Sequence, residues 1–485
     1  MNSLNKQPNT KYANITVQYP FPIYEPKGEI READKKIAKT IIDATKGSFI
    51  ADADYLKDLH VLGEEDILNT LPSAKKVKEI REKVGKALVK MNANSNAEEI
   101  TNYVIDKTTG LEKIGPLLRD PDLEEIMINK EGQEIFVYHK NFRMCKTKIK
   151  FKEEELIKTI KKIAKTAGKE FNEQNPILNA RLPDGSRVNA TLNLVTPFGT
   201  TITIRKFTKK PLSITQLIEN KTISSELASL LWLAVDGFDI NPQNILIIGG
   251  AGTGKTTLLI ALTNFIRHSE RILTIEDVPE INLADRENWV ALESKPKSPI
   301  NPEITMEDLL INSLRMRPDR IIVGEVRGEE AQTLFTAMDT GHNGILGTLH
   351  ANNPKETILR LKSHPMDVPE TNLPLLNLII EVDKHFDPKT GLNRYVNAVA
   401  ELERLEDKVL LSNIFEYDLD EKQLFKTNVP SRIIEKIAEI AGKTKNDIKK
   451  ELEIREEILD EMVKEKIFDY LDVNKIIKKY YEKEN

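Results

Sequence analysis

The segment with the clearest chemical potential is residues 249–257, which read GGAGTGKTT. It matches the pattern G-x-x-x-x-G-K-[ST], follows the apolar run ILII and precedes an amphipathic helical pattern. A strand, a glycine loop and a helix in this order direct free backbone N–H groups at an anion, at the positive end of the helix dipole. The sequence therefore predicts a phosphate-binding loop. Its residues are Gly249, Gly250, Ala251, Gly252, Thr253, Gly254, Lys255, Thr256 and Thr257.

Two side chains of this loop have defined expected roles. Lys255 is expected to reach the β- and γ-phosphates of ATP, and the hydroxyl of Thr256 is expected to hold Mg²⁺. The alternative is a flexible glycine-rich turn without a ligand. The apolar run before the loop and the helical pattern after it favour the phosphate loop, because an ordinary turn needs neither.

Three further apolar runs end in polar residues. RILTI ends in Glu276 and Asp277, IIVG ends in Glu325, and ILGTL ends in His350. In a parallel sheet the C-terminal ends of the strands face one crevice, where ligands bind. We therefore expect these residues and the phosphate loop to meet at a single nucleotide.

Each of these residues has an expected part in phosphoryl transfer. Glu325 would orient the attacking water, because in-line displacement at phosphorus depends on positioning. Glu276 and Asp277 would hold Mg²⁺ directly or through water, and His350 would donate a hydrogen bond to the γ-phosphate. The alternative for each carboxylate is a solvated strand end. His342, in the sequence GHN, has two interpretations, a site residue or a turn residue satisfied by backbone.

The elements that must position these residues follow from the pattern of the chain. Apolar strands alternate with amphipathic helices in the region of the motifs, which predicts an α/β fold with a mainly parallel sheet covered on both faces. The predicted parts are a flexible arm with four prolines at 1–30, a helical region at 31–110, a small mixed α/β domain at 111–210, a larger α/β domain at 211–425 and a helical extension at 426–485.

Composition narrows the function classes. The 485 residues include 71 basic and 76 acidic ones, a net charge of −5, which argues against a protein that coats nucleic acid. The single cysteine, Cys145, excludes an intramolecular disulfide and a four-cysteine zinc module. The N-terminus has no apolar signal region, and no uncharged apolar run of 18 residues occurs. We therefore expect a cytoplasmic protein without direct membrane insertion.

Four motifs, in order, resemble those of the type II/type IV secretion ATPase superfamily. GGAGTGKTTLL is similar to its phosphate loop, IEDVPEI to its aspartate box, LRMRPDRIIVGEVRG to its Walker B segment and GHNGILGTLHANNP to its histidine box. The segment LPDGSRVNATLNLVTPFGTTITIRKF resembles the archaeal branch, which assembles archaella or type IV pili. Walker B here rests on Gly324 and Glu325, with Asp319 at the start of the strand.

The resemblance implies a RecA-like P-loop motor domain at 211–425 and a PAS-like domain at 111–210. It implies a hexamer that hydrolyses Mg-ATP, acts through an integral membrane platform protein with possible accessory assembly proteins, and builds a pilus-like filament, archaellum or secretion pseudopilus. It further implies that Arg187 and Arg205, with Arg181 as a weaker third, complete a neighbouring subunit's site. Closure would be a rotation about the linker near 208–213.

Strand alternation supports the arginine assignment from the residues themselves. In the two strands of the hairpin the apolar residues share one face, which places Arg187 and Arg205 on the other face, where they could meet a charged ligand. The alternative is a pair of solvated hairpin arginines.

Two other functions compete with a secretion motor. One is a RecA-like nucleic-acid motor, such as a helicase or DNA-packaging ATPase, which needs a basic channel with aromatic side chains. The acidic balance of the chain and its 11 Tyr, 15 Phe and 2 Trp disfavour it, and no nucleic-acid partner is expected. The other is a nucleotide switch that does not hydrolyse ATP, which Glu325 and His350 disfavour.

Overall fold

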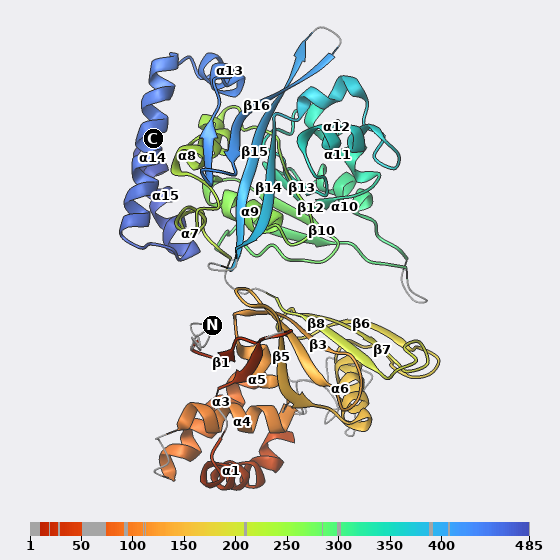
Figure 1. Ribbon diagram of the computed structural model, residues 1–485. Coiled ribbons are helices and arrows are strands. Elements are labelled where there is room, and N and C mark those ends of the chain that lie inside the picture. The colour runs from red at the N-terminus through yellow and green to blue at the C-terminus, as the bar shows by residue number, and fades with distance from the viewer. Residues whose placement is uncertain are drawn as a thin grey trace. The chain divides into compact units, whose positions relative to one another are not determined.

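The computed structural model divides into two compact units, Met1–Thr208 and Lys209–Asn485 (Figure 1). Each unit is described by itself. The residues described are 10–18, 20–27, 30–50, 74–91, 96–109, 111, 113–207, 211–283, 285–297, 302–387, 391–405 and 408–484. Three parts of the predictions lie outside them, namely positions 1–9 of the arm, 51–73 of the helical region and 208–210 of the linker.

Unit 1 is built around an eight-stranded sheet with the strand order β1-β2-β5-β4-β3-β8-β7-β6. Buried and exposed residues alternate along β4, β7 and β8, so that one face of the sheet packs on helix α6. Leu156, Ile160 and Ile163 of α6 are fully buried in this core. The bounds are β1 Ala13–Thr16, β2 Ile23–Pro26, β3 Leu123–Ile128, β4 Glu134–His139, β5 Arg143–Lys150, α6 Glu153–Thr166, β6 Ile177–Arg181, β7 Arg187–Thr191 and β8 Thr201–Arg205.

Part of the region predicted to be a flexible arm forms β1 and β2 instead. The two strands pair with each other, and β2 joins the sheet beside β5. Ala13, Ile15 and Tyr24 are buried, and the Tyr24 hydroxyl donates a hydrogen bond to the buried Asp120. Pro20 and Pro22 lie between the strands and Pro26 lies at the end of β2, where the sheet needs no backbone donor. This corrects the prediction for the described part of residues 1–30.

Three helices of unit 1 form a small core of their own. Ala38 of α1, Val84 and Leu88 of α3 and Val104 of α4 are buried together. The spacing of these apolar residues is that of amphipathic helices, which bury one stripe each. The bounds are α1 Glu32–Ile50, α3 Ala74–Lys90 and α4 Ala97–Thr109, and α5 Gly115–Arg119 follows them.

Unit 2 contains a nine-stranded sheet with the order β11-β10-β12-β13-β9-β14-β15-β16-β17. The pairs from β11 to β14 are parallel and those from β14 to β17 are antiparallel. β9 is central, and β13 separates it from β12, which is the arrangement of a RecA-like motor domain. The predicted α/β class is confirmed. The bounds are β9 Ile245–Ile248, β10 Ile272–Glu276, β11 Trp289–Glu293, β12 Arg320–Val326, β13 Leu346–Leu349, β14 Leu378–Asp387, β15 Gly391–Leu405, β16 Lys408–Asp418 and β17 Gln423–Lys426.

Helices cover both faces of this sheet (Figure 1). Ile245 and Ile247 of β9 face the core that holds α7, α8 and α9, whereas Leu246 and Ile248 face the core that holds α10 and α11. A strand buried on both faces needs a continuous apolar run, which explains ILII. The bounds are α7 Ile214–Glu219, α8 Ser225–Asp236, η2 Gly237–Asp239, α9 Lys255–Leu262, η3 Thr263–Phe265, α10 Met306–Ser313, α11 Glu330–Asp339, α12 Pro354–Lys362 and η4 Glu370–Leu375.

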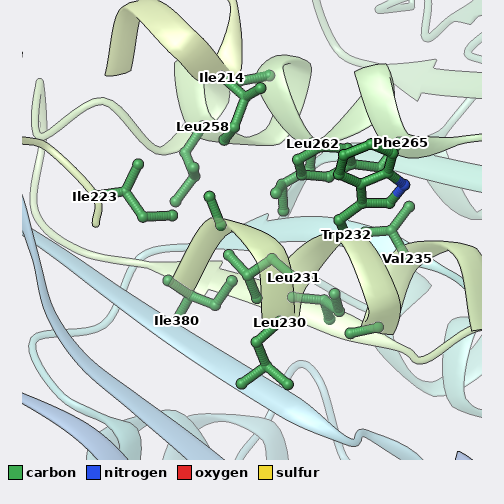
Figure 2. Packing of buried hydrophobic residues seen from close by; sticks show 14 of the residues in the cluster. Ile214, Ile223, Leu230, Leu231, Trp232, Val235, Leu258, Leu262, Phe265 and Ile380 are labelled. Carbon is green, nitrogen blue, oxygen red and sulfur yellow. The ribbon is translucent and has the colours of Figure 1, made fainter. Parts of the chain in front are cut away.

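The C-terminal helices α13 (Arg432–Ile440), α14 (Lys445–Lys464) and α15 (Tyr470–Glu484) belong to the same core as α9. Trp232 of α8 stacks on Phe265 just beyond α9, with ring centroids 5.2 Å apart (Figure 2). The Trp232 indole N–H donates to the Tyr481 hydroxyl at 2.7 Å, and that hydroxyl donates to the Phe265 carbonyl at 2.7 Å. The end of the helix that follows the phosphate loop therefore packs against α15.

A buried ion pair fastens α14 to α8. Arg455 and Asp236 are both fully buried, and Arg455 Nη2 lies 3.1 Å from Asp236 Oδ2. The other oxygen of Asp236 accepts a hydrogen bond from Arg267 Nε at 2.7 Å. Removing one partner of such a group leaves an unpaired charge inside the protein, which is strongly destabilising.

Among the helices of the described residues, none is both long enough and apolar enough to cross a lipid bilayer.

Candidate active site

The segment 249–254 connects β9 to α9 and has the backbone that its glycines predict. Gly252 and Gly254 have φ values of +70° and +98°, which favour glycine. At Gly249, whose φ is +149°, an added Cβ would lie 2.2 Å from the carbonyl oxygen of Val382 on the neighbouring strand. Glycine is therefore required both for the turn and for the close approach of β14.

Lys255 occupies the first position of α9 and bends back over this loop. Its Nζ donates to the carbonyl oxygens of Gly249 at 3.0 Å and Gly250 at 2.9 Å. Burial lowers the pKa of Lys255, and the neighbouring positive charge of Arg327 acts in the same direction against the attraction of Glu325. An ammonium that donates to two carbonyl oxygens of the loop can exchange these contacts for phosphate oxygens.

The strand ends meet as the sequence predicts. β13 lies between β9 and β12, and Leu349 stands beside both Ile248 and Val326 in the register. Consequently His350, which follows Leu349, lies between the phosphate loop after β9 and the end of β12. Its Nε2 lies 2.9 Å from Glu325 Oε1, and its Nδ1 lies 3.4 Å from Lys255 Nζ. One imidazole thus bridges the lysine of the loop and the carboxylate of β12.

The pKa of His350 is lowered from its ordinary value. Burial is the largest cause, and the charge of Lys255 adds to it, while the carboxylate of Glu325 opposes both. The ring is therefore neutral at physiological pH and can donate one hydrogen bond and accept another. Arg360 of α12 donates to the backbone carbonyl of His350 and holds the turn after β13 in place.

Glu325 lies inside β12, not after its end. Its Oε2 accepts a hydrogen bond from Arg327 Nη2, and Arg327 Nη1 lies 3.6 Å from Asp277 Oδ2. Asp277 also accepts a hydrogen bond from the Ser294 hydroxyl at 2.9 Å. Arg327 and Ser294 were not among the predicted site residues. The VRG that continues the Walker B segment could have indicated Arg327, whereas Ser294 follows a strand that no motif marked.

Glu276 is placed differently from the sequence prediction. It is buried, and its Oε1 accepts hydrogen bonds from the backbone N–H groups of Glu280 at 2.8 Å and Ile281 at 3.1 Å. An added Cβ at Gly324 would lie 2.7 Å from Glu276 Cγ, so this glycine leaves room for the side chain. The geometry favours a role in shaping the loop after β10 over direct coordination of Mg²⁺. Asp277, which is half exposed, remains available to the site.

His342 lies at the other edge of the sheet. The adjacent Gly344 packs against Arg320, at the start of β12, and Pro242, shortly before β9. Because parallel strands all begin at one edge and end at the other, this position is opposite the phosphate loop. The His342 backbone N–H donates to the Ala337 carbonyl at 3.0 Å, as expected of a turn residue after α11. The structure supports the turn interpretation.

Arg187 and Arg205 lie in unit 1. They stand directly opposite each other on β7 and β8, and Arg181 stands opposite Arg187 on β6. Their neighbours Val188 and Ile204 are buried, so all three arginines share the face away from the core. Arg205 is exposed and Arg187 is half-buried. Their contribution to a neighbouring subunit's site stays a prediction.

The residues of the loop fit a magnesium-bound nucleoside triphosphate. The glycines leave the backbone amides open to phosphate oxygens, and the half-buried Thr256 hydroxyl stands in the first turn of α9. Among the described residues, no group of three or more His, Cys, Asp or Glu side chains could hold a metal by itself. Mg²⁺ usually takes one or two protein ligands together with phosphates and water, and the Thr256 hydroxyl is placed to be one of them.

The central strand, the loop and the strand order define unit 2 as a RecA-like P-loop domain. A family model described as "Type II/IV secretion system protein" matches residues 107–382, more than half of the chain. The chain belongs to this family.

Relatives in curated collections agree with this assignment. The protein MJ0900 of Methanocaldococcus jannaschii is 38% identical over 382 residues, which are 77% of this chain and 68% of the relative. MJ0781 of the same organism is 47% identical over 232 residues, 47% of this chain, but the match spans only 32% of that relative. The type IV secretion system protein VirB11 of Brucella suis biovar 1 is 30% identical over 272 residues, 52% of this chain and 75% of the relative.

Proposed function

We propose that this protein hydrolyses Mg-ATP and uses the energy to drive a membrane-associated secretion or filament-assembly machine. One observation supports this most directly. Lys255 of the phosphate loop, His350 of β13 and Glu325 of β12 lie in one continuous line of contacts at the edge of the sheet where ligands bind. A protein that only binds nucleotide needs the loop but has no use for the carboxylate and imidazole beside it.

The residues divide the work of phosphoryl transfer between them. With ATP bound, Lys255 would exchange the carbonyl oxygens of Gly249 and Gly250 for the β- and γ-phosphates. The Thr256 hydroxyl and Asp277 would hold Mg²⁺. Mg²⁺ supplies neutralisation of the charge on the phosphate oxygens.

The carboxylate of Glu325, beside His350, positions the attacking water. Glu325 can do so once its carboxylate is released from Arg327. His350, neutral because burial lowers its pKa, donates to the γ-phosphate and senses whether that group is present.

Family membership and the arginines of β7 and β8 support the proposal for the wider machine. We infer a cytoplasmic hexamer in which Arg187 and Arg205 of one subunit approach the nucleotide of the next. An integral membrane platform protein, with accessory assembly proteins, would receive the motion and extrude subunits of a pilus-like filament, archaellum or secretion pseudopilus. The family assignment supports a secretion machine, and the choice of filament is part of the proposal.

Glu325→Gln tests the proposed activity. The substitution keeps the size of the side chain and removes its charge, so it should leave ATP binding intact and lower the rate of phosphate release by about 100-fold. Binding is measured with a fluorescent ATP analogue and turnover by released phosphate.

Lys255→Ala is the matched control and should lose both binding and turnover. Full turnover by Glu325→Gln would remove the catalytic assignment. Nucleotide binding by neither the unchanged chain nor the variant would remove the proposed function.

A further inference from the structure

The hairpin of β14 and β15 carries two cationic side chains against the phosphate loop. β14 runs parallel to β9 and pairs Glu381 with Ile248, the last residue of β9. Beyond that pair β9 ends, but β14 continues, so its next residues run alongside the loop. Lys384 of β14 stands directly opposite Arg394 of β15 in the antiparallel register.

Both side chains bind the backbone of the loop. Lys384 Nζ donates to the carbonyl oxygen of Ala251 at 2.6 Å, and Arg394 Nε donates to that of Gly252 at 3.1 Å. An added Cβ at Gly252 would lie 3.2 Å from Lys384 Nζ, and one at Gly254 would lie 3.3 Å from Arg394 Cδ. The glycines of the motif therefore serve a second purpose, because they let the hairpin cations approach the chain closely.

The two contacts also constrain the backbone N–H groups that follow the bound carbonyls. In a planar trans peptide the C=O and the following N–H point in opposite directions. Fixing the carbonyls of Ala251 and Gly252 therefore also fixes the N–H groups of Gly252 and Thr253, which belong to the loop's anion-binding face. A charge-assisted bond to a carbonyl also polarises its peptide group, which makes the N–H a better donor.

The arrangement has an energetic cost that argues for a role. Two like charges directly opposite each other on a hairpin destabilise it. This repulsion is offset because each cation donates to a backbone carbonyl oxygen, Lys384 to that of Ala251 and Arg394 to that of Gly252. Their positive charge beside the loop also favours an incoming polyphosphate.

We propose that Lys384 and Arg394 are positioning residues for the nucleotide: they hold the carbonyls of Ala251 and Gly252 so that the loop's amides are preset to bind phosphate. This inference rests on the proposed nucleotide site. Both residues lie outside the four recognised motifs, in a hairpin whose sequence shows no phosphate-binding pattern.

Paired substitutions separate the hydrogen bond from the charge. Lys384→Met and Arg394→Met keep a long unbranched apolar stem but lose the donor, whereas Lys384→Gln and Arg394→Gln keep an N–H donor without charge. We expect each Met variant to weaken binding of a fluorescent ADP analogue by about tenfold, the double Met variant to weaken it further, and the Gln variants to recover most of the affinity.

Lys408→Ala, an exposed lysine on β16, is the surface control and should bind normally. The melting temperature of each variant shows whether folding is retained, and a lowered affinity at an unchanged melting temperature supports the positioning role. Normal affinity in the double Met variant, or Gln variants as weak as the Met variants, would overturn it while leaving the nucleotide site itself standing. Failure of the unchanged chain to bind nucleotide would overturn both proposals.

Discussion

The imidazole of His350 is the link between the loop lysine and the β12 carboxylate. It lies 3.4 Å from Lys255 Nζ and 2.9 Å from Glu325 Oε1. Because its pKa is lowered by burial and by the charge of Lys255, it stays neutral down to a pH below the ordinary histidine value. Protonation of His350 would place a second positive charge beside Lys255 and form an ion pair with Glu325, which would then be less able to position water.

This predicts a specific pH dependence of catalysis. The turnover number should be flat from about pH 8 down to about 6.5 and fall only below that, as His350 gains its proton. His350→Gln, which stays neutral at every pH, should turn over about tenfold more slowly but lose the acidic fall. The measurement is phosphate release at saturating ATP across this range. An acidic fall that persists unchanged in the variant would assign the titration to another group.

Apolar runs place the residues that meet at the site near the C-terminal ends of parallel strands, which is why the sequence could point to them. Lys255, Glu325 and His350 each occupy a position fixed by the end of an apolar run. Glu276 satisfies the same pattern, yet its carboxylate accepts backbone N–H groups of the following loop. The path of that loop is not periodic, so no pattern in the sequence could show where its amides point. Lys384 and Arg394 could not be predicted for the same reason. Their partners are backbone carbonyl oxygens, whose direction no sequence pattern shows.

Among the elements, the helices are most closely specified by local sequence. The spacing Thr305-x-x-Asp308 is that of a capping box, and the structure has this box at the start of α10: Asp308 N–H donates to the Thr305 hydroxyl at 3.0 Å, and Thr305 N–H donates to Asp308 Oδ2 at 2.9 Å. In α11 the apolar Leu334 and Phe335 are buried, as their helical spacing favours. The strands β1 and β2 were not anticipated, because four-residue strands bounded by prolines have too little periodicity to read.

The contact between α8 and α14 gives a prediction at the scale of elements. Asp236→Asn should lower the stability of unit 2 by about 3 kcal/mol, because Arg455 and Arg267 lose the charge that compensates them. Unfolding in urea is followed by tryptophan fluorescence, since both tryptophans, Trp232 and Trp289, lie in unit 2.

Asp472→Asn, which removes one partner of an exposed ion pair with Lys475, is the control and should have little effect. Equal midpoints for Asp236→Asn and the control would show that the buried pair contributes no stability.

At the scale of the whole molecule, the proposed hexamer separates two parts of one catalytic site onto two chains. Arg205→Ala subunits retain Glu325 but lack the arginine, and Glu325→Gln subunits have the reverse defect. If the sites are shared, a mixed ring contains some interfaces with both residues intact, so mixing should restore part of the ATPase activity. The assay is phosphate release over a series of mixing ratios, with ring assembly checked by light scattering. Mixed rings that stay as inactive as either variant would place each site within one chain.

The division of the chain into two units follows the change of pattern that the sequence shows near the Lys-Lys-Pro at 209–211. The motor fold could be anticipated because its motifs have a fixed order and each follows a buried strand. Association with other subunits could not be derived in the same way. Exposed arginines such as Arg205 have the same local pattern whether they face water or a neighbour's phosphate.

Helix α15 packs against the end of α9, the helix that follows the phosphate loop, and so belongs to the hydrophobic core of unit 2. Tyr481 forms hydrogen bonds with both the Trp232 indole and the Phe265 carbonyl. Removing α15 by truncation before Tyr470 would therefore expose these aromatic rings to solvent and remove the packing at the C-terminal end of α9. If the proposed ATPase activity holds, a tilt of α9 on phosphate release would reach α15 through these contacts, so a probe attached to α15 would report it.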